Sequence, residues 1–218
     1  MSRNYYVRYS PSPRSREELF QHVLTCLYRL DKNTSLEERW CSELNFSRGK
    51  WDGEAPTAFA TYAEALTAAR DWQGMRIWFY CNGGDLPLTI LTSANERDLS
   101  VILMESSMPY AEQCVDQDAN SRWRTFLLDV ATAIDADFYL MECEPEYETI
   151  SKEEFIRLLF APAFRNATNL PIVTAFHERL MPNFPGKLVV PDCHCSHQLG
   201  SYMEIVEKDF EPQQRTKD

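Results

Sequence analysis

The sequence predicts an α+β fold: an antiparallel sheet, built from a three-stranded meander and flanking strands, with helices packed mainly on one face. Two observations support this prediction. Apolar residues recur at helical spacing in some segments and alternate as in strands in others. Three strand-like runs also follow one another across two tight turns, which is typical of antiparallel strands. Only one expected connection could be a parallel crossover, so we do not expect a doubly wound nucleotide-binding fold.

The N-terminal segment predicts a strand followed by an amphipathic helix. Residues 4–9 alternate, include β-prone tyrosines, and end at a Ser-Pro-Ser-Pro turn. Ser15 and Glu18 then form the pattern of a capping box, which satisfies backbone N–H groups at a helix start. The apolar residues that follow keep the 3.6-residue period, so we expect a helix over 16–31.

The next segment predicts most of the sheet. Residues 39–46 are expected to form a strand, and a second capping pattern opens a helix over 61–73 that ends at a glycine. The meander strands are expected at 75–82, 86–93 and 99–105. Aromatic and branched side chains are frequent in these runs, so we expect them to contribute to the core.

The second half continues with helices and strands and then becomes irregular. A polar loop over 107–120 precedes a long helix whose apolar face extends over 123–134. A strand is expected at 137–144, and a capping pattern opens a short helix over 151–160. Residues 162–218 are rich in proline, which predicts an irregular C-terminal extension packed on a single domain. That single domain is expected to span the whole chain.

The charge of the chain is unevenly distributed and narrows the class of partner. The net charge is −11, and residues 96–154 alone hold fifteen acidic and four basic side chains, whereas residues 1–70 are almost neutral. Nucleic acids and anionic membranes need a basic surface, so neither is an expected partner. An acidic field instead attracts basic proteins and speeds their association, although it also serves solubility.

Composition indicates a soluble protein of a reducing compartment. Hydrophobic residues make up 44% of the chain, which is enough for a packed core. We find no apolar run of membrane-spanning length and no secretory signal, so we expect a cytoplasmic protein. The seven cysteines are odd in number and scattered, which is typical of thiols rather than of a disulfide framework. The sequence leaves open whether the protein forms a homodimer.

The strongest candidate for a binding surface is an acidic run that contains one tyrosine. Glu142, Glu144, Glu146 and Glu148 are two residues apart, so an extended chain would place them on one side. Such a row could also protect a strand edge from aggregation, or supply a general acid and base. We favour a partner-binding surface, because rigid aromatics among acids suit a basic protein. The candidate partner-binding residues are Trp51, Glu112, Asp116, Asp118, Asp135, Asp137, Glu142, Glu144, Glu146, Tyr147 and Glu148.

A second candidate is a compact group formed by Cys193, His194, Cys195 and His197. Thiolates and imidazoles are zinc ligands, so this group raises a metal site as an alternative. The spacing argues against it, because adjacent residues cannot easily surround one tetrahedral ion and structural sites combine separated pairs. We therefore expect no metal and no other cofactor.

Motifs of common catalytic classes are missing from the sequence. The chain has only seven glycines, and it lacks the dinucleotide-binding, P-loop, nucleophile-elbow and HExxH zinc-protease patterns. We therefore expect a binding protein rather than an enzyme.

The order of elements resembles that of a family of bacterial immunity proteins. An N-terminal strand is followed by the helix over 17–30, by Arg39-Trp40, and by an aromatic strand that ends in Asn82-Gly83-Gly84. Two more strands and the helix–strand unit over 123–144 complete the pattern. This order is similar to immunity proteins of polymorphic-toxin and type VI secretion systems, in particular those paired with restriction-endonuclease-like toxins.

The resemblance implies a toxin-neutralising function. A member of this family would bind its cognate toxin in the cytoplasm of the producing cell and occlude the active site of the toxin. Against a nuclease, acidic side chains would imitate phosphate charge and meet the basic groove. The alternatives are a zinc-binding module or metal-dependent enzyme centred on the cysteine–histidine group, and a general protein-interaction adaptor.

Overall fold

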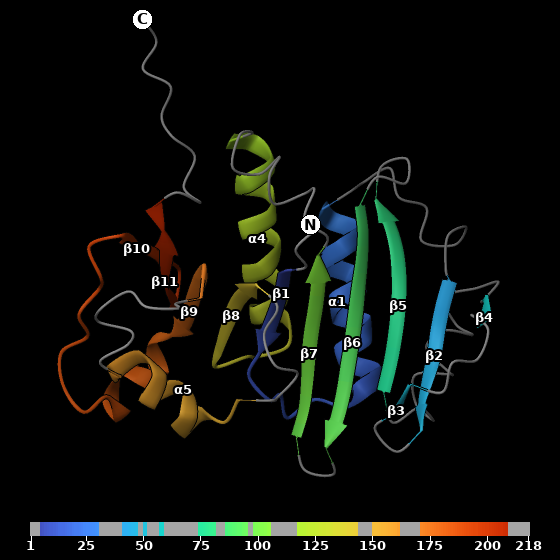
Figure 1. The fold of residues 1–218 in the computed structure, drawn as a ribbon, viewed down its shortest axis with the longest axis horizontal. Coiled ribbons are helices and arrows are strands. Elements are labelled where there is room, and N and C mark those ends of the chain that lie inside the picture. Colours follow the sequence, from blue (N-terminus) through green and yellow to red (C-terminus); the bar gives the residue numbers. More distant parts are fainter. Residues whose placement is uncertain are drawn as a thin grey trace, which may run out of the picture.

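The computed structural model shows a long antiparallel sheet with helices packed against it (Figure 1). It describes residues 5–30, 41–47, 50–51, 57–58, 74–81, 86–95, 98–105, 117–143, 150–161 and 171–208. Every strand pair within these residues is antiparallel. The predicted α+β class with an antiparallel sheet is therefore confirmed.

The described elements follow the chain in a mixed order. The strands are β1 (Tyr5–Tyr9), β2 (Cys41–Ser47), β3 (Lys50–Trp51), β4 (Thr57–Ala58), β5 (Gly74–Cys81), β6 (Leu86–Asn95), β7 (Asp98–Glu105), β8 (Phe138–Cys143), β9 (Val173–His177), β10 (His194–Leu199) and β11 (Tyr202–Glu207). The helices are α1 (Arg16–Leu30), α4 (Gln117–Ala133), α5 (Lys152–Phe160) and the short 3₁₀ helix η1 (Glu178–Asn183).

The first strand lies in the middle of the sheet. The strand order is β10-β11-β9-β8-β1-β7-β6-β5-β2-β3, and β4 pairs with β2 outside this path. Val7 of β1 lies opposite Leu103 of β7 on one side and Met141 of β8 on the other. The sheet therefore consists of two halves, β2–β7 and β8–β11, which β1 joins.

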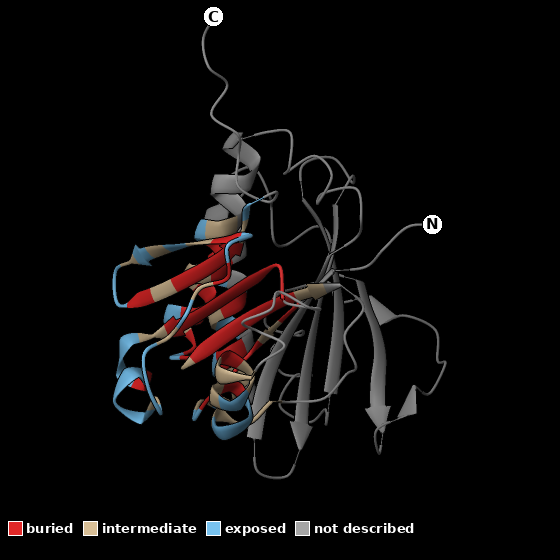
Figure 2. Cartoon of the chain, turned by 60° about the vertical axis from the view of Figure 1, so that its left-hand side comes forward, coloured by how far each residue is buried: buried red, intermediate tan, exposed pale blue. Residues whose placement is uncertain are grey.

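The alternation of side chains along β8 divides the core between the two faces of the sheet. Phe138 and Leu140 belong to a cluster with Phe155 of α5. Tyr139 points to the other face, where its ring lies 5.5 Å from that of Tyr9, and the Tyr9 hydroxyl donates to the Leu127 carbonyl of α4 at 3.1 Å. Figure 2 shows this buried half of the sheet in red. Both faces of β8 are therefore core, as the period of two in a strand requires.

The short helix α5 is held on one face by aromatic packing. Phe155 and Leu159 lie one helical turn apart and are almost fully buried. The Phe155 ring stacks on that of Phe138 at a centroid distance of 4.0 Å. Burial of one such side chain contributes about 1.5–3 kcal/mol, so this pair fixes a helix that is too short to be stable alone.

The two long helices cover the opposite face. The predicted helix over 16–31 is α1, which buries Leu19, Val23 and Cys26 at helical spacing and contacts α4. Helices were expected mainly on one face, and α1 and α4 do share one. The position of α5 and η1 on the other face was not predicted. It follows from the burial of both faces of β8, since each face needs a cover.

The C-terminal segment differs from its prediction. An irregular extension was expected over 162–218, yet within that range β9, β10 and β11 extend the sheet from β8. The reason is that Val173 to Phe176 are all buried, so β9 lacks the alternation of apolar and polar residues that predicts a strand. Among residues 171–208, the prolines lie outside these strands.

Two other predictions concern segments that the structure describes only in part or not at all. The helix expected over 61–73 and residues 107–116 of the expected polar loop lie outside them. Residues 117–120, assigned to the same loop, instead form the first turn of α4.

Candidate functional site

Asp135 and Asp137 lie together where α4 turns into β8. The turn closes through two backbone hydrogen bonds, from Asp135 to the Thr132 carbonyl at 3.2 Å and from Ala136 to the Ala131 carbonyl at 2.9 Å. This pair of bonds defines a Schellman motif, whose key position needs a left-handed backbone. Asp135 occupies it with a φ of 57° and is the one non-glycine residue with positive φ in the described chain. The turn therefore presents the Asp135 side chain at the surface.

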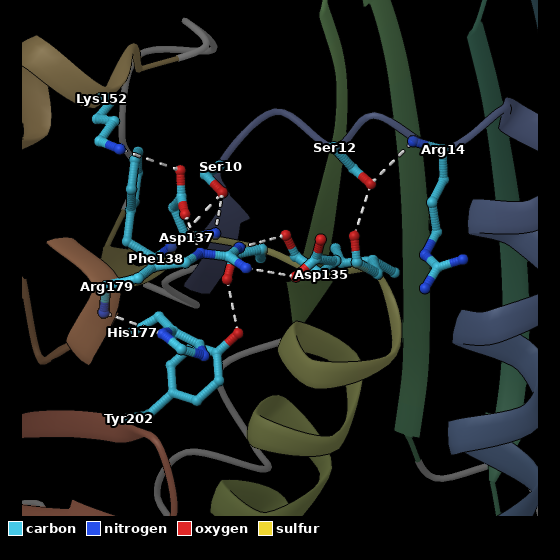
Figure 3. A network of polar contacts seen from close by, with 12 residues as sticks. Ser10, Ser12, Arg14, Asp135, Asp137, Phe138, Lys152, His177, Arg179 and Tyr202 are labelled. Carbon is cyan, nitrogen blue, oxygen red and sulfur yellow. Dashed lines mark hydrogen bonds and ion pairs between the residues drawn. The ribbon is translucent and has the colours of Figure 1, made fainter.

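Arg179 of η1 joins the two aspartates into what we call the Arg179 cluster, made of Asp135, Asp137, Lys152 and Arg179 (Figure 3). Its guanidinium donates to Asp135 Oδ1 at 2.6 Å and to the Asp135 carbonyl at 2.8 Å. The same group also donates to Asp137 Oδ1. Lys152 Nζ lies 3.9 Å from Asp137 Oδ2. The cluster thus brings together residues from α5, η1 and the α4–β8 turn.

Neighbouring groups hold the cluster in place. His177 caps η1, and its Nδ1 accepts a hydrogen bond from the Arg179 backbone at 3.1 Å. The His177 ring packs edge-on against Tyr202, whose hydroxyl donates to the Ala136 carbonyl at 2.6 Å. Ser10 Oγ accepts the Asp137 backbone N–H at 2.7 Å. The start of β8 is therefore fixed from both sides.

The Arg179 cluster contains two acidic and two basic side chains, so its charges balance, and all four are partly exposed. Burial acts to lower the pKa of Arg179, but its hydrogen bonds to Asp135 and Asp137 outweigh this and raise that pKa. Burial has the opposite effect on the acidic hydroxyl of Tyr202, whose pKa it raises to about 12. The side chains of Asp135, Arg179 and Asp137 remain 52%, 38% and 28% exposed. An exposed ion pair stabilises little, so these groups can exchange one partner for another at small cost.

Glu142, the first glutamate of the acidic run, lies in a different environment. Its carboxylate pairs with Arg8 of β1, and both side chains are largely buried. In the sheet Glu142 lies opposite Tyr6 of β1, and the pairing of β8 with β9 ends one residue before it, at Met141. A largely buried carboxylate that pairs with an arginine does not match the alternative of an exposed acidic edge at this residue.

The remaining predicted partner-binding residues are described only in part. Asp118 lies in α4 and Trp51 in β3, where the structure defines their backbone. The other members lie outside the described residues: Glu112, Asp116, Glu144, Glu146, Tyr147 and Glu148.

A buried acid between α4 and the sheet was not predicted. Glu204 of β11 is fully buried and accepts a hydrogen bond from Arg124 Nε at 3.0 Å and another from the Tyr139 hydroxyl at 3.2 Å. Burial, and then the charge of Glu204, raise the pKa of Tyr139. The sequence signal for this buried acid was Glu204 itself, which lies among the apolar residues of β11. Its partner Arg124, however, is 80 residues away in the chain.

The cysteine–histidine group does not converge on one point. His194, Cys195 and His197 belong to β10, where neighbouring side chains point to opposite faces. Cys195 Sγ lies 3.6 Å from the Val206 carbonyl, while Cys193 Sγ lies 3.1 Å from His194 Nδ1. Within the described residues, no three histidine, cysteine or acidic side chains form a group that could hold a metal ion.

By its fold, the described part of the chain is an α+β protein with a central antiparallel sheet that carries helices on both faces. No family model matches the chain, and no curated protein matches it. A solved structure with a similar chain is the 1.75 Å crystal structure of the toxic C-terminal tip of CdiA from Pseudomonas aeruginosa in complex with its immune protein. The similarity covers 68% of this chain and 90% of that chain, with 8% identity and a TM-score of 0.37.

The described helices also bear on membrane association. None of them combines the length and the apolar character that crossing a bilayer would need.

Proposed function

We propose that the protein is an immunity protein, which binds a basic toxin and blocks its active site. The observation that carries the proposal is the concentration of negative charge in residues 96–154. Within this segment, β7 and β8 flank β1, and α4 packs over the same part of the sheet. A rigid centre is a suitable support for a charged docking surface, because positioned charges lose little freedom on binding.

The described candidate acids divide into two groups by their basic partner, because Arg8 is 12% exposed and Arg179 is 38% exposed. Glu142 is largely buried against Arg8, so we assign it a structural part. Asp135 and Asp137 are more exposed and pair with Arg179 at the surface. We propose that an arginine or lysine of the partner competes with Arg179 for these two carboxylates.

The remaining members of the surface complete the proposal. We propose that the excess negative charge comes from Glu112, Asp116, Asp118, Glu144, Glu146 and Glu148, with Tyr147 and Trp51 as aromatic anchors. Such a surface would enter the substrate groove of a nuclease, where acids take the place of phosphates. Inhibition would then follow from occlusion, without any chemical step.

Co-expression tests the proposed function directly. The protein encoded beside this chain should arrest growth when it is expressed alone, and growth should recover when this chain is expressed with it. Arrest that persists despite formation of the complex would indicate an adaptor instead. No complex and no recovery would contradict the proposal.

A matched pair of variants tests the acidic surface. We expect the triple variant Glu144→Gln, Glu146→Gln, Glu148→Gln to slow association by about tenfold at low salt, because steering depends on local charge. The control removes three charges outside residues 96–154: Glu178→Gln, Asp192→Asn and Glu207→Gln. Association rates measured between about 50 and 500 mM salt compare the two variants. Equal rates in both variants, or rates that do not depend on salt, would exclude electrostatic capture.

A further inference from the structure

We propose that Cys193 and His194 form a reactive thiol site that is modified by low-molecular-weight disulfides. Cys193 is exposed to solvent, and its Sγ lies 3.1 Å from Nδ1 of His194. His194 is 8% exposed, whereas Cys193 is an exposed residue. The proposal is independent of toxin binding, since it rests on a different part of the fold.

The backbone fixes the two side chains relative to one another. Cys193 lies in the turn before β10, and its carbonyl accepts the Lys208 backbone N–H at 2.9 Å. The His194 backbone N–H donates to the Pro191 carbonyl at 2.9 Å. His194 then enters the β10–β11 pairing opposite Glu207. Both residues are thus held by main-chain bonds, so the contact between thiol and imidazole does not depend on a mobile loop.

The contact allows a proton to move from sulfur to nitrogen. An imidazole without a proton on Nδ1 can accept the thiol proton, which leaves a thiolate beside an imidazolium. The thiolate is the nucleophile in disulfide exchange, and an unassisted thiol is only a few per cent thiolate at neutral pH. We therefore expect the contact with His194 to speed the exchange by about tenfold, because the imidazole can take the proton as the sulfur attacks.

The exchange reaction balances without a further oxidant. The Cys193 thiolate attacks one sulfur of a small disulfide RSSR, a new S–S bond forms, and the S–S bond of the reagent breaks. The leaving thiolate takes the proton from His194. The products are a mixed disulfide on Cys193 and one molecule of RSH.

The other described thiols lie in different environments. Cys26 belongs to α1 and is buried, and Cys195 is half-buried with its sulfur directed at the Val206 carbonyl. The charged residues next to Cys193 are Asp192, which precedes it, and Lys208, which pairs with its backbone, and both are exposed. Their charges oppose one another, so the contact with His194 is what distinguishes this thiol from Cys26 and Cys195, the other cysteines whose side chains the structure describes.

The rate of reaction with a neutral dipyridyl disulfide tests the proposal. Mass spectrometry of the briefly treated, folded full-length protein should find Cys193 modified first, and Cys193→Ser should remove this fast phase. Cys195→Ser should leave the phase unchanged. His194→Gln should slow it by about tenfold while the circular dichroism spectrum stays the same. Initial modification at another cysteine would overturn the proposal.

A second measurement needs no variant and so does not depend on how His194→Gln folds. Cys193 in the folded wild-type protein should react about tenfold faster than Cys193 in the same chain unfolded in urea, because unfolding separates the thiol from the imidazole. An ordinary surface thiol shows no such gain on folding. Equal or slower reaction in the folded protein would overturn the proposal.

Discussion

At the scale of single residues, Asp135 combines a left-handed backbone conformation with a side chain that forms an ion pair. The left-handed conformation at the end of α4 suits glycine, which has no Cβ to meet the neighbouring carbonyl oxygen. Aspartate is tolerated there more readily than most residues, because its short polar side chain can bond locally. Here that side chain binds Arg179 and so connects α4 to η1.

Two substitutions at this position separate the backbone effect from the ion pair. Asp135→Gly and Asp135→Ala both remove the carboxylate, but only alanine retains a Cβ. The αL conformation costs an ordinary L-residue about 1–2 kcal/mol, and glycine loses part of this advantage through its greater freedom when unfolded. We expect the Ala variant to have a free energy of unfolding about 1 kcal/mol lower than the Gly variant, as measured by urea titration. Equal stabilities would contradict the strained turn.

The sequence could predict one half of this site. Asp135 and Asp137 were selected as surface acids, and the structure does bring them together. Arg179 was not selected, because it is 44 residues away from Asp135 and belongs to a 3₁₀ helix with no periodic signal. A local pattern identifies acids that are neighbours in sequence, whereas their basic partner is set by the tertiary fold.

At the scale of elements, α5 shows what local signals predict well. Ser151 and Glu154 form both bonds of the capping box: the Ser151 N–H donates to Glu154 Oε2 at 2.8 Å, and the Glu154 N–H donates to Ser151 Oγ at 3.2 Å. The same geometry links Ser15 and Glu18 at the start of α1. Both helix starts were predicted because the interacting residues are three positions apart.

The capping box makes part of the stability depend on pH. The backbone hydrogen bond from Ser151, followed by the one from its side chain, lowers the pKa of Glu154 below its ordinary value of 4.5. A lowered carboxyl pKa means that the stabilisation is present above the ordinary value and is lost as the pH falls through the folded-state value. We expect wild type to exceed Glu154→Gln in stability at neutral pH, and the difference to disappear in acid. Thermal unfolding at a series of pH values measures this difference.

A neighbouring residue provides the control for that measurement. Glu153→Gln removes the same charge one position earlier, outside the capping box. Its stability relative to wild type should change less over the same acid range. A Glu154→Gln profile that runs parallel to wild type would show that the cap does not titrate.

The strands β9 to β11 show where element prediction fails. β9 is buried along most of its length, and β10 consists of polar residues and cysteine apart from its last residue. Neither sequence therefore alternates between polar and apolar residues, which is the signal of a half-buried strand. The pairing of β11 with both of them forms the sheet. Such strands are fixed by what surrounds them, and that information is not local.

At the scale of the whole molecule, the cohesion of the sheet depends on β1. Val7 is fully buried and lies between strands from both halves. We expect Val7→Ala to lower the free energy of unfolding by about 2 kcal/mol, because two buried methyl groups are lost and a small cavity remains. Hydrogen exchange should become faster in β7 and β8 alike.

An exposed position at the end of the sheet serves as the control for Val7→Ala. Ser196→Ala in β10 should change stability by less than about 0.5 kcal/mol. Faster exchange confined to one half of the sheet after Val7→Ala would show that the halves unfold separately.

The central position of β1 also has a consequence for synthesis on the ribosome. The strand is made early, yet Arg8 contacts Glu142, which is 134 residues further along the chain. Closing such a long loop is slow, so the nascent β1 stays exposed until β7 and then β8 have been made. Both of these strands belong to the acidic segment 96–154. A chain whose synthesis stops before residue 138 therefore has a first strand that lacks at least one of its two neighbours.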